Sequence, residues 1–151
     1  MRAIFLCLAL TACVAAPMPD VQTRSAIAGD ALSLASQERV ARGLPPLRPD
    51  RRLAMAAREQ AAFMARRGRL GHDGPGGSNV LQRVQATGVQ VCHVAENVAA
   101  GQTDAAQVHG DWMGSAGHRS NILNRNMDSG AVVSVEDNGT TWWAMVLSGP
   151  C

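Results

Sequence analysis

The sequence predicts an α+β fold in which helices cover both faces of a small sheet. Two observations carry this prediction. Helix-forming segments fill the chain up to about residue 115, and a β-hairpin ends it. Both faces of that hairpin are apolar, which is typical of a sheet that is covered on both sides. A chain of 151 residues is long enough for one domain with one core.

Residues 1–12 have the features of an export signal. An arginine precedes an apolar run that is too short for a permanent membrane-spanning helix. The "LTAC" at residues 10–13 resembles the lipobox of bacterial lipoproteins, whose cysteine is diacylated and becomes the new N-terminus. The alternative is simple cleavage after Ala16, which would leave Pro17 directly behind the cut. We expect an exported lipoprotein, in the periplasm or at the cell surface, whose acyl chains on Cys13 hold it to a membrane.

The chain behind the signal divides into a tether and a domain. Residues 13–26 contain prolines and no amphipathic period, which predicts a lipid-anchored tether before a domain at 27–151. The first helix is expected over residues 29–42 and ends at Gly43. Its predicted apolar stripe consists of Ile27, Ala31, Leu34 and Ala41.

A second helix is predicted from its N-cap Asp50 to Arg67. The residues of its apolar face recur at steps of three and four: Leu53, Ala57, Gln60, Ala61 and Met64. An irregular loop at 71–79 leads into a short helix over 79–86.

The next segments also have helical character. "HVAENVAA" at 93–100 is helical in propensity and is bounded by Gly101. Thr103 is the expected cap of a helix over 104–115. Its inner face carries Val108, Trp112 and Ser115. All three tryptophans of the chain are expected in the core rather than at a ligand site.

The C-terminal hairpin turns at Asn138-Gly139, the dipeptide that best tolerates the positive φ angles of a type I′ turn. A two-residue turn fixes the register of the two strands. The expected pairs on one face are Val135 with Trp142, Val133 with Ala144 and Ala131 with Val146.

Two cysteines remain once the signal and the lipid account for the others. In an oxidising compartment, Cys92 and Cys151 most economically form one disulfide. It would close a loop of about 60 residues, and the chain-entropy model gives an upper figure of roughly 4 kcal/mol for its contribution to stability. A metal site at two such distant cysteines is the weaker alternative.

Charge is distributed unevenly along the chain. Residues 48–69 hold seven arginines and two acidic residues, a net charge of +5, whereas the rest of the mature chain has six arginines and ten acidic residues, a net of −4. This asymmetry would orient the domain on anionic lipid headgroups, or it marks a solvated helical face. Export and scarce aromatic residues argue against nucleic acid as a partner. The sequence contains no lysine and no tyrosine, so Schiff-base and phenol chemistry are excluded.

Candidate chemistry lies at the edges of the predicted elements. The chain has no nucleotide-binding loop, zinc-protease motif or serine-hydrolase elbow. His72 follows the second helix, Glu96 lies in a segment poor in charge, and His118 follows the helix that carries a tryptophan. Brought together, two imidazoles and a carboxylate would suit a divalent cation, zinc above all, or general acid–base work. From spacing alone, three ordinary polar residues remain the better interpretation.

The other histidines carry less weight. The pair His93 and Glu96 has metal-ligand spacing on a helix, but such pairs arise often by chance. We expect His93 and His109 to be solvated polar residues.

Four segments together resemble the bacterial branch of the CAP superfamily, which groups cysteine-rich secretory proteins, antigen 5 and plant pathogenesis-related proteins. They are "SQERVARGLPPLRPDRRLAMAAREQAAFMA", "GHDG", "AENVAAG" and "WMGSAGHRSNIL", within residues 30–148. The resemblance implies a three-layer α-β-α sandwich of the CAP/SCP type, with the C-terminal hairpin in a small mixed or antiparallel sheet. It also implies an open cleft. His72 and His118 match its two cation-binding histidines, and Glu96 matches its first glutamate.

The chain departs from that pattern in two places. Eukaryotic members have a second glutamate where this chain has Ser115, although the bacterial branch commonly has serine there. Relatives often have histidine where this chain has Gln60. The cleft therefore has one matched carboxylate, and the sequence does not place Asp73 or Asp111 in it.

Three functions follow as hypotheses. The favoured one is a binding module whose cleft, formed by His72, Glu96, Ser115 and His118, holds a small molecule, a lipid or an envelope component, with a divalent cation at the two histidines. No nucleotide or organic cofactor is expected. The second is a hydrolase in which a metal at the histidines activates water and Glu96 is the base. The third is a structural envelope protein. Whether the chain is an enzyme stays open, and the small residues before His118 are expected to turn its imidazole into the cleft.

Overall fold

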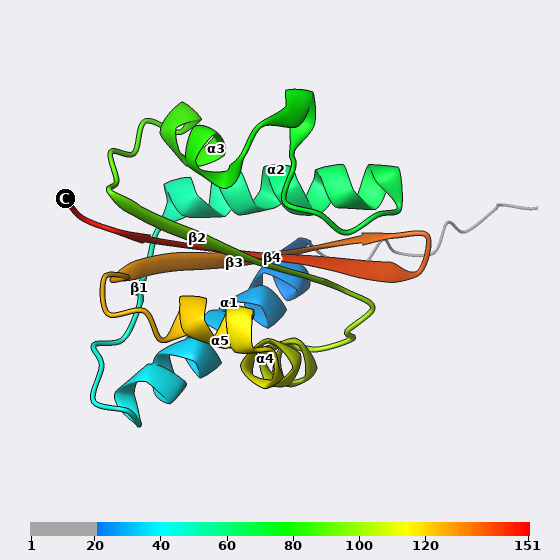
Figure 1. Ribbon diagram of the computed structural model, residues 1–151. Coiled ribbons are helices and arrows are strands. Elements are labelled where there is room, and N and C mark those ends of the chain that lie inside the picture. Colours follow the sequence, from blue (N-terminus) through cyan, green and yellow to red (C-terminus); the bar gives the residue numbers. More distant parts are fainter. Residues whose placement is uncertain (1–20) are drawn as a thin grey trace, which may run out of the picture.

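The computed structural model describes residues 21–151, with side chains from Asp30 onward. Four strands form one sheet in the order β1-β3-β4-β2, and helices cover both faces of it. In Figure 1, α2 and α3 lie on one side of the sheet, whereas α1, α4 and α5 lie on the other. The predicted three-layer α-β-α sandwich is therefore confirmed, and its sheet is mixed.

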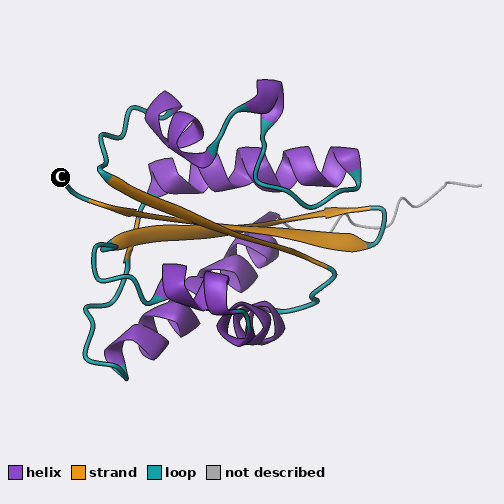
Figure 2. Cartoon of the chain, in the orientation of Figure 1, coloured by secondary structure: helices purple, strands orange, loops and turns teal. Residues whose placement is uncertain are grey.

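The described part of the chain contains five α-helices, one 3-10 turn (η1) and four strands (Figure 2). Their bounds, in chain order, are α1 Val21–Val40, β1 Arg48–Pro49, α2 Arg51–Arg67, η1 Pro75–Gly77, α3 Val80–Ala86, β2 His93–Ala100, α4 Ala105–Gly114, α5 Ala116–Ile122, β3 Ser129–Asp137 and β4 Thr140–Gly149. The export signal at 1–12, the lipidation site Cys13 and the first part of the tether lie outside the described residues.

The first helix starts earlier than the sequence indicated. α1 begins at Val21, so residues 21–26, expected in the tether, are helical. Its buried face also differs from the predicted stripe, because Leu34 is only half-buried and Ala41 lies exposed beyond the helix end. The residues that α1 buries are Ala31, Leu32, Ala35 and Arg39.

The second helix follows its prediction closely. The Asp50 carboxylate accepts the backbone N–H groups of Arg52 and Leu53, at 2.7 and 3.2 Å, and so caps α2. Gly68 ends the helix in the left-handed conformation, with φ of 58°. All five residues of the predicted apolar face are buried: Leu53, Ala57, Gln60, Ala61 and Met64.

The prediction of helical character for residues 93–100 is wrong, because this segment is strand β2. It pairs antiparallel with β4 from His93↔Gly149 to Ala100↔Trp142. Alanine, glutamate and asparagine favour strand weakly on their own, but pairing with β4 and burial between two helical layers outweigh that preference. Because side chains alternate along a strand, His93 and Glu96 point to opposite faces of β2 and do not form a metal-ligand pair.

The C-terminal hairpin is confirmed in turn and register. Asn138 and Gly139 have φ angles of 48° and 74°, as a type I′ turn requires. The three predicted cross-strand pairs are present as expected, at Ala131↔Val146, Val133↔Ala144 and Val135↔Trp142.

Two apolar clusters fill the space on either side of the sheet. The first lies between the sheet and the layer of α1, α4 and α5 and includes Trp112 and Trp143. The second lies between the sheet and α2 with α3 and includes Leu53, Met64 and Trp142. The tryptophans are 1–8% exposed, so their predicted place in the core is confirmed.

A fully buried arginine joins α1 to the chain around α5. The Arg39 guanidinium donates to four backbone carbonyl oxygens, those of Pro45, Ile122, Asn124 and Met127, at 2.5–2.8 Å. Burial lowers the pKa of this guanidinium, and the charge of Asp128 opposes the shift. These bonds satisfy carbonyl groups that the end of α5 and the following loop would otherwise bury without partners.

The predicted disulfide is present. Cys92 and Cys151 are bonded and lie 59 residues apart in sequence, so they tie the end of β4 to the start of β2. None of the described helices is long and apolar enough to cross a membrane.

Candidate functional site

The strand β2 brings the candidate residues together, because it forms one edge of the sheet. Side chains alternate along a strand, so Glu96 faces the layer of α2 and α3, and Asn97 faces the layer of α5. The loop after α2 carries His72 past this edge on one side, and α5 carries His118 on the other. We call these residues, with Arg83 and Asn121, the β2-edge site.

A buried ion pair lies at the centre of the β2-edge site. The side chains of Glu96 and Arg83 are 2% and 1% exposed, and Nη2 of Arg83 lies 2.6 Å from Oε2 of Glu96. Arg83 also donates to the carbonyl oxygens of Ser78, at 2.6 Å, and His72, at 3.2 Å. This arginine therefore compensates the carboxylate and holds the loop that carries His72.

The second oxygen of Glu96 orients an imidazole. Nδ1 of His72 lies 2.9 Å from Oε1 of Glu96. Because a carboxylate paired with a guanidinium only accepts hydrogen bonds, we assign the proton of this contact to Nδ1 of His72. The His72 side chain is 60% exposed, and its Nε2 keeps a lone pair that no described residue uses.

The small residues before His118 suggested that it would lie in a turn. The structure places it within the short helix α5. Gly114 and Ser115 let α4 end and α5 start in a new direction, and Ser115 is the residue shared by the two helix ends. Burial lowers the pKa of the half-buried His118 imidazole, and repulsion from the protonated form of His72 adds to this shift. The neutral form of His118 is thus favoured next to His72.

Two asparagines fix α5 to the strand. Nδ2 of Asn97 donates to the carbonyl oxygen of His118 at 3.0 Å. Nδ2 of Asn121 donates to Oδ1 of Asn97 at 2.8 Å and to the carbonyl oxygen of Glu96 at 3.3 Å. The bond to Glu96 covers a backbone oxygen on the outer edge of β2, and together these bonds hold α5, which carries His118, against the strand.

Gln60 and Gly74 shape the loop of His72. The buried Gln60 donates from Nε2 to the carbonyl oxygen of Gly71 at 2.6 Å. A Cβ atom on Gly74 would lie 2.7 Å from Nη1 of Arg83 and 2.8 Å from Oγ of Ser78. The absence of a side chain at Gly74 therefore lets the loop close over the guanidinium.

The remaining candidate residues contribute less. Asp73 is exposed, and the Asp111 carboxylate accepts from Nε2 of Gln102 at 2.8 Å. His93 is exposed at the start of β2, as expected. The prediction that His109 is a solvated residue is wrong, because its side chain is half-buried. Burial lowers its pKa, and Nδ1 has no hydrogen-bond partner among the described residues.

Sequence reasoning gave no role to Arg83 or Asn97, although the structure places both in the β2-edge site. Asn97 lies within the "AEN" segment, directly after Glu96, so a motif marked it without showing its contacts. Arg83 carried no such signal. It is one of fourteen arginines, and only its burial distinguishes it from the solvated ones.

The donor set does not fit a zinc site with three protein ligands. Both oxygens of Glu96 are engaged, by His72 and Arg83. In the described part of the chain, no three His, Cys, Asp or Glu side chains are grouped so that they could hold a metal ion. Two imidazoles remain as direct donors, with Glu96 as the acceptor that orients one of them, as carboxylates do for many metal-binding histidines.

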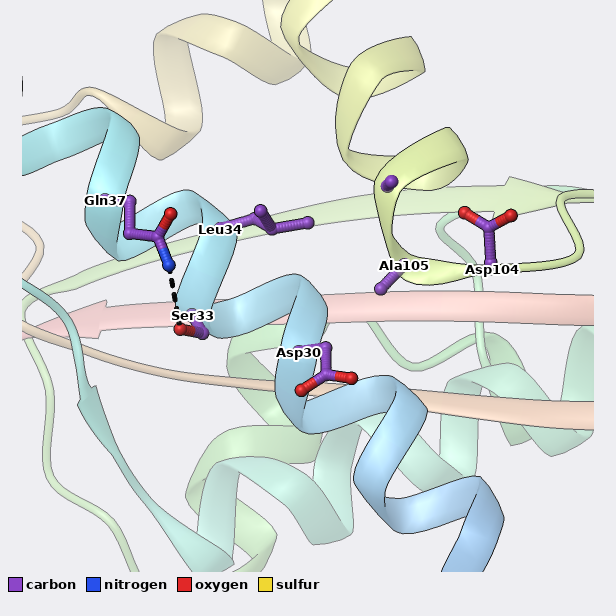
Figure 3. A pocket seen from close by; sticks show the side chains of 7 residues that line it. Asp30, Ser33, Leu34, Gln37, Asp104 and Ala105 are labelled. Carbon is purple, nitrogen blue, oxygen red and sulfur yellow. Dashed lines mark hydrogen bonds between the residues drawn. The ribbon is translucent and has the colours of Figure 1, made fainter.

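Two hollows lie away from the β2-edge site. The first, about 510 Å³, lies between α1 and α4 (Figure 3). Leu34 and Ala105 border it together with the carboxylates of Asp30 and Asp104. Asp104 is also the N-cap of α4 in place of the expected Thr103, since it accepts the N–H of Gln107 at 2.8 Å. The second, about 280 Å³, lies beside β1. None of the predicted site residues borders either hollow.

Comparisons with known proteins agree with this fold. Residues 32–147 match the CAP cysteine-rich secretory protein family. The uncharacterized protein YkwD of Bacillus subtilis is 33% identical over 111 residues, which are 74% of this chain and 43% of that protein.

Solved structures are similar as well. An extracellular protein containing a SCP domain from Bacillus anthracis superposes with a TM-score of 0.80 at 24% identity, over 89% of this chain and 45% of that one. An outer surface protein from Borrelia burgdorferi superposes with a TM-score of 0.75 at 18% identity, over 82% and 92%. The chain thus spans less than half of the two Bacillus proteins. With its fold and the extent of the sequence match, the chain belongs to the CAP family of cysteine-rich secretory proteins.

Proposed function

We propose that this chain is an exported binding protein whose β2-edge site holds a ligand together with a divalent cation. One contact carries the proposal: the Glu96 carboxylate engages Nδ1 of His72 at 2.9 Å, which leaves Nε2 of this largely exposed side chain as the ring atom available to a metal. His118 supplies the second imidazole. Burial lowers the pKa of His118, which favours the neutral form that a metal-binding imidazole requires.

The chemistry of such a site favours binding over hydrolysis. With two imidazole donors, a cation such as zinc keeps open positions that oxygen or nitrogen atoms of a ligand can fill. A hydrolase would need a free base close to the water that it activates. Glu96 does not meet that need, because Arg83 and His72 occupy both of its oxygens.

Zinc titration by calorimetry tests this proposal on the purified protein. We expect stoichiometric zinc binding that is lost in His72→Ala and in His118→Ala. His93→Ala is the matched control, since this exposed histidine lies on β2 but belongs to no contact of the site, and it should bind zinc as the wild type does. Undiminished binding in the double variant of His72 and His118 would contradict the proposal.

Export and anchoring form the second part of the proposal. The apolar start of the chain and its "LTAC" segment support a lipid on Cys13, and the Bacillus anthracis relative is described as extracellular and the Borrelia relative as an outer surface protein. Labelling of producing bacteria with radioactive palmitate should mark the wild type and not Cys13→Ser. A Cys7→Ser variant, which should be labelled as the wild type is, controls for expression. Equal labelling of the Cys13→Ser variant would overturn the anchor.

A further inference from the structure

Among the described residues, 21–151, only β1 pairs with the outer edge of β3, and it covers a small part of that edge. β1 pairs with β3 at only two positions, Arg48↔Ser129 and Pro49↔Gly130, and the chain then enters α2. Beyond Gly130, no strand of the described chain lies on this side of β3. An unpaired edge of this kind presents backbone N–H and C=O groups to any chain that can lie beside it.

The direction of these backbone groups follows from the neighbouring bonds. The N–H of Asp50 donates to the carbonyl oxygen of Gly130 at 3.1 Å, so the peptide groups of Gly130 point to the outer edge. Because this direction alternates along a strand, Val132 and Ser134 also present their backbone groups there. The two-residue turn gives the same result, since it directs the groups of Asp137 inward to Thr140.

A hollow of about 280 Å³ lies where β1 leaves this edge. It is bordered by small and apolar side chains and by the start of α2, namely Leu32, Pro49, Asp50, Arg51, Ala54, Gly130, Ala131 and Val132. The hollow therefore continues the open edge and has room for side chains of an added strand.

Two arginines flank the same edge, and the one carboxylate that borders the hollow, that of Asp50, accepts the N–H groups at the start of α2. Arg51 and Ala54 border the hollow, and helical spacing places Arg58 on the same flank of α2, about 10 Å along the helix from Arg51. Both arginines are exposed, and neither forms an ion pair with a described residue. They belong to the segment 48–69, whose net charge is +5.

We propose that this edge binds an acidic peptide of a partner protein, which adds to β3 as a further strand. Its backbone would pair with Val132 and Ser134, and two of its carboxylates would pair with Arg51 and Arg58. Carboxylates four residues apart on one face of a strand are separated by about 13 Å, which the flexible side chains can match to the two arginines.

Charge distinguishes this partner from two others. If two copies of the chain paired antiparallel through β3, the arginines of one α2 would lie against those of the other, which is unfavourable. An anionic lipid surface would neutralise the charge of the arginines, but it cannot pair with the N–H and C=O groups of a strand edge as another strand does.

Fluorescence anisotropy with a defined peptide tests the proposal on the whole protein. The probe is a labelled, end-blocked octapeptide of valine and threonine with two glutamates four residues apart. We expect it to bind at least about tenfold more tightly than the same peptide with two lysines, and than one N-methylated at alternate amides, because these lack either the charge or the strand bonds. Equal binding of all three peptides, or no binding of any, would overturn the proposal.

Variants of the protein locate the binding. Arg51→Glu combined with Arg58→Glu should weaken the binding of the acidic peptide at least about tenfold and strengthen the binding of the lysine peptide. Ser134→Pro removes one outward N–H without touching the bonds to β4 and should weaken the peptide, whereas Ser134→Ala should not. The control, Arg66→Glu with Arg69→Glu, reverses two charges at the other end of α2 and just beyond it. It should bind the acidic peptide as the wild type does.

Two further outcomes would favour the other occupants. One outcome is that Arg51→Glu with Arg58→Glu leaves peptide binding unchanged but abolishes binding to phosphatidylglycerol vesicles. The partner of this edge would then be a lipid surface and not a peptide. The other outcome is that sedimentation shows a dimer for the wild type and a monomer for Ser134→Pro. The partner of this edge would then be a second copy of the chain. Near-ultraviolet circular dichroism of the buried tryptophans establishes that each variant is folded.

Discussion

Replacing Arg83 with methionine removes the guanidinium that pairs with Glu96 in the interior of the domain. The wild-type side chain donates to one charged acceptor, Oε2 of Glu96, and to the carbonyl oxygens of Ser78 and His72. A hydrogen bond to a charged group contributes about 2 kcal/mol and a neutral one about 1 kcal/mol, which gives about 4 kcal/mol for Arg83. The loss of one partner from a buried ion pair costs a similar amount, about 3–5 kcal/mol.

The free energy of unfolding, measured with urea and followed by tryptophan fluorescence, should therefore fall by about 4 kcal/mol in Arg83→Met. For a domain of this size the melting temperature should fall by about 15 °C. Arg52→Met is the matched control. Arg52 is exposed and donates to the carbonyl oxygen of Gly88 at 3.3 Å, so its loss should cost less than about 0.5 kcal/mol.

A second substitution separates the buried charge from the lost contacts. In the Arg83→Met background, Glu96→Leu removes the uncompensated carboxylate and should restore about 2–4 kcal/mol. A cost of less than about 1 kcal/mol for Arg83→Met, or a further loss on adding Glu96→Leu, would refute the reasoning that this ion pair organises the β2-edge site.

Three other substitutions test separate features. Gly74→Ala should lower the free energy of unfolding by about 1–3 kcal/mol, because its Cβ atom meets Nη1 of Arg83 at 2.7 Å, whereas Gly71→Ala, with open space around it, should not. Cys92→Ser with Cys151→Ser should cost at most about 4 kcal/mol in urea unfolding; no change under oxidising conditions would contradict the entropy argument. Burial, and then the charge of His72, lower the pKa of His118 below its ordinary 6.5, so its contribution to stability is present above that pH and is lost as the pH falls through the lowered pKa. His118→Gln should therefore lose less stability than the wild type between about pH 7.5 and about pH 5, and an equal loss would contradict this cause.

The sequence by itself determined the parts of the fold that rest on local chemistry. The cap at Asp50, the apolar face of α2, the turn at Asn138-Gly139 and the register that it fixes all depend on residues close together in the chain. The pairing of Cys92 with Cys151 was also predicted from the sequence, because the expected export signal and lipid would account for Cys7 and Cys13.

Only the tertiary structure decided the form of residues 93–100 and the contacts of the candidate site. Their composition favours a helix, yet an open edge of β4 and two helical layers offered more backbone pairing and burial than a helix could. That outcome placed Glu96 beside Arg83 and His72, and Asn97 beside α5. Such contacts join segments that lie 13–24 residues apart, so no local pattern in the chain encodes them.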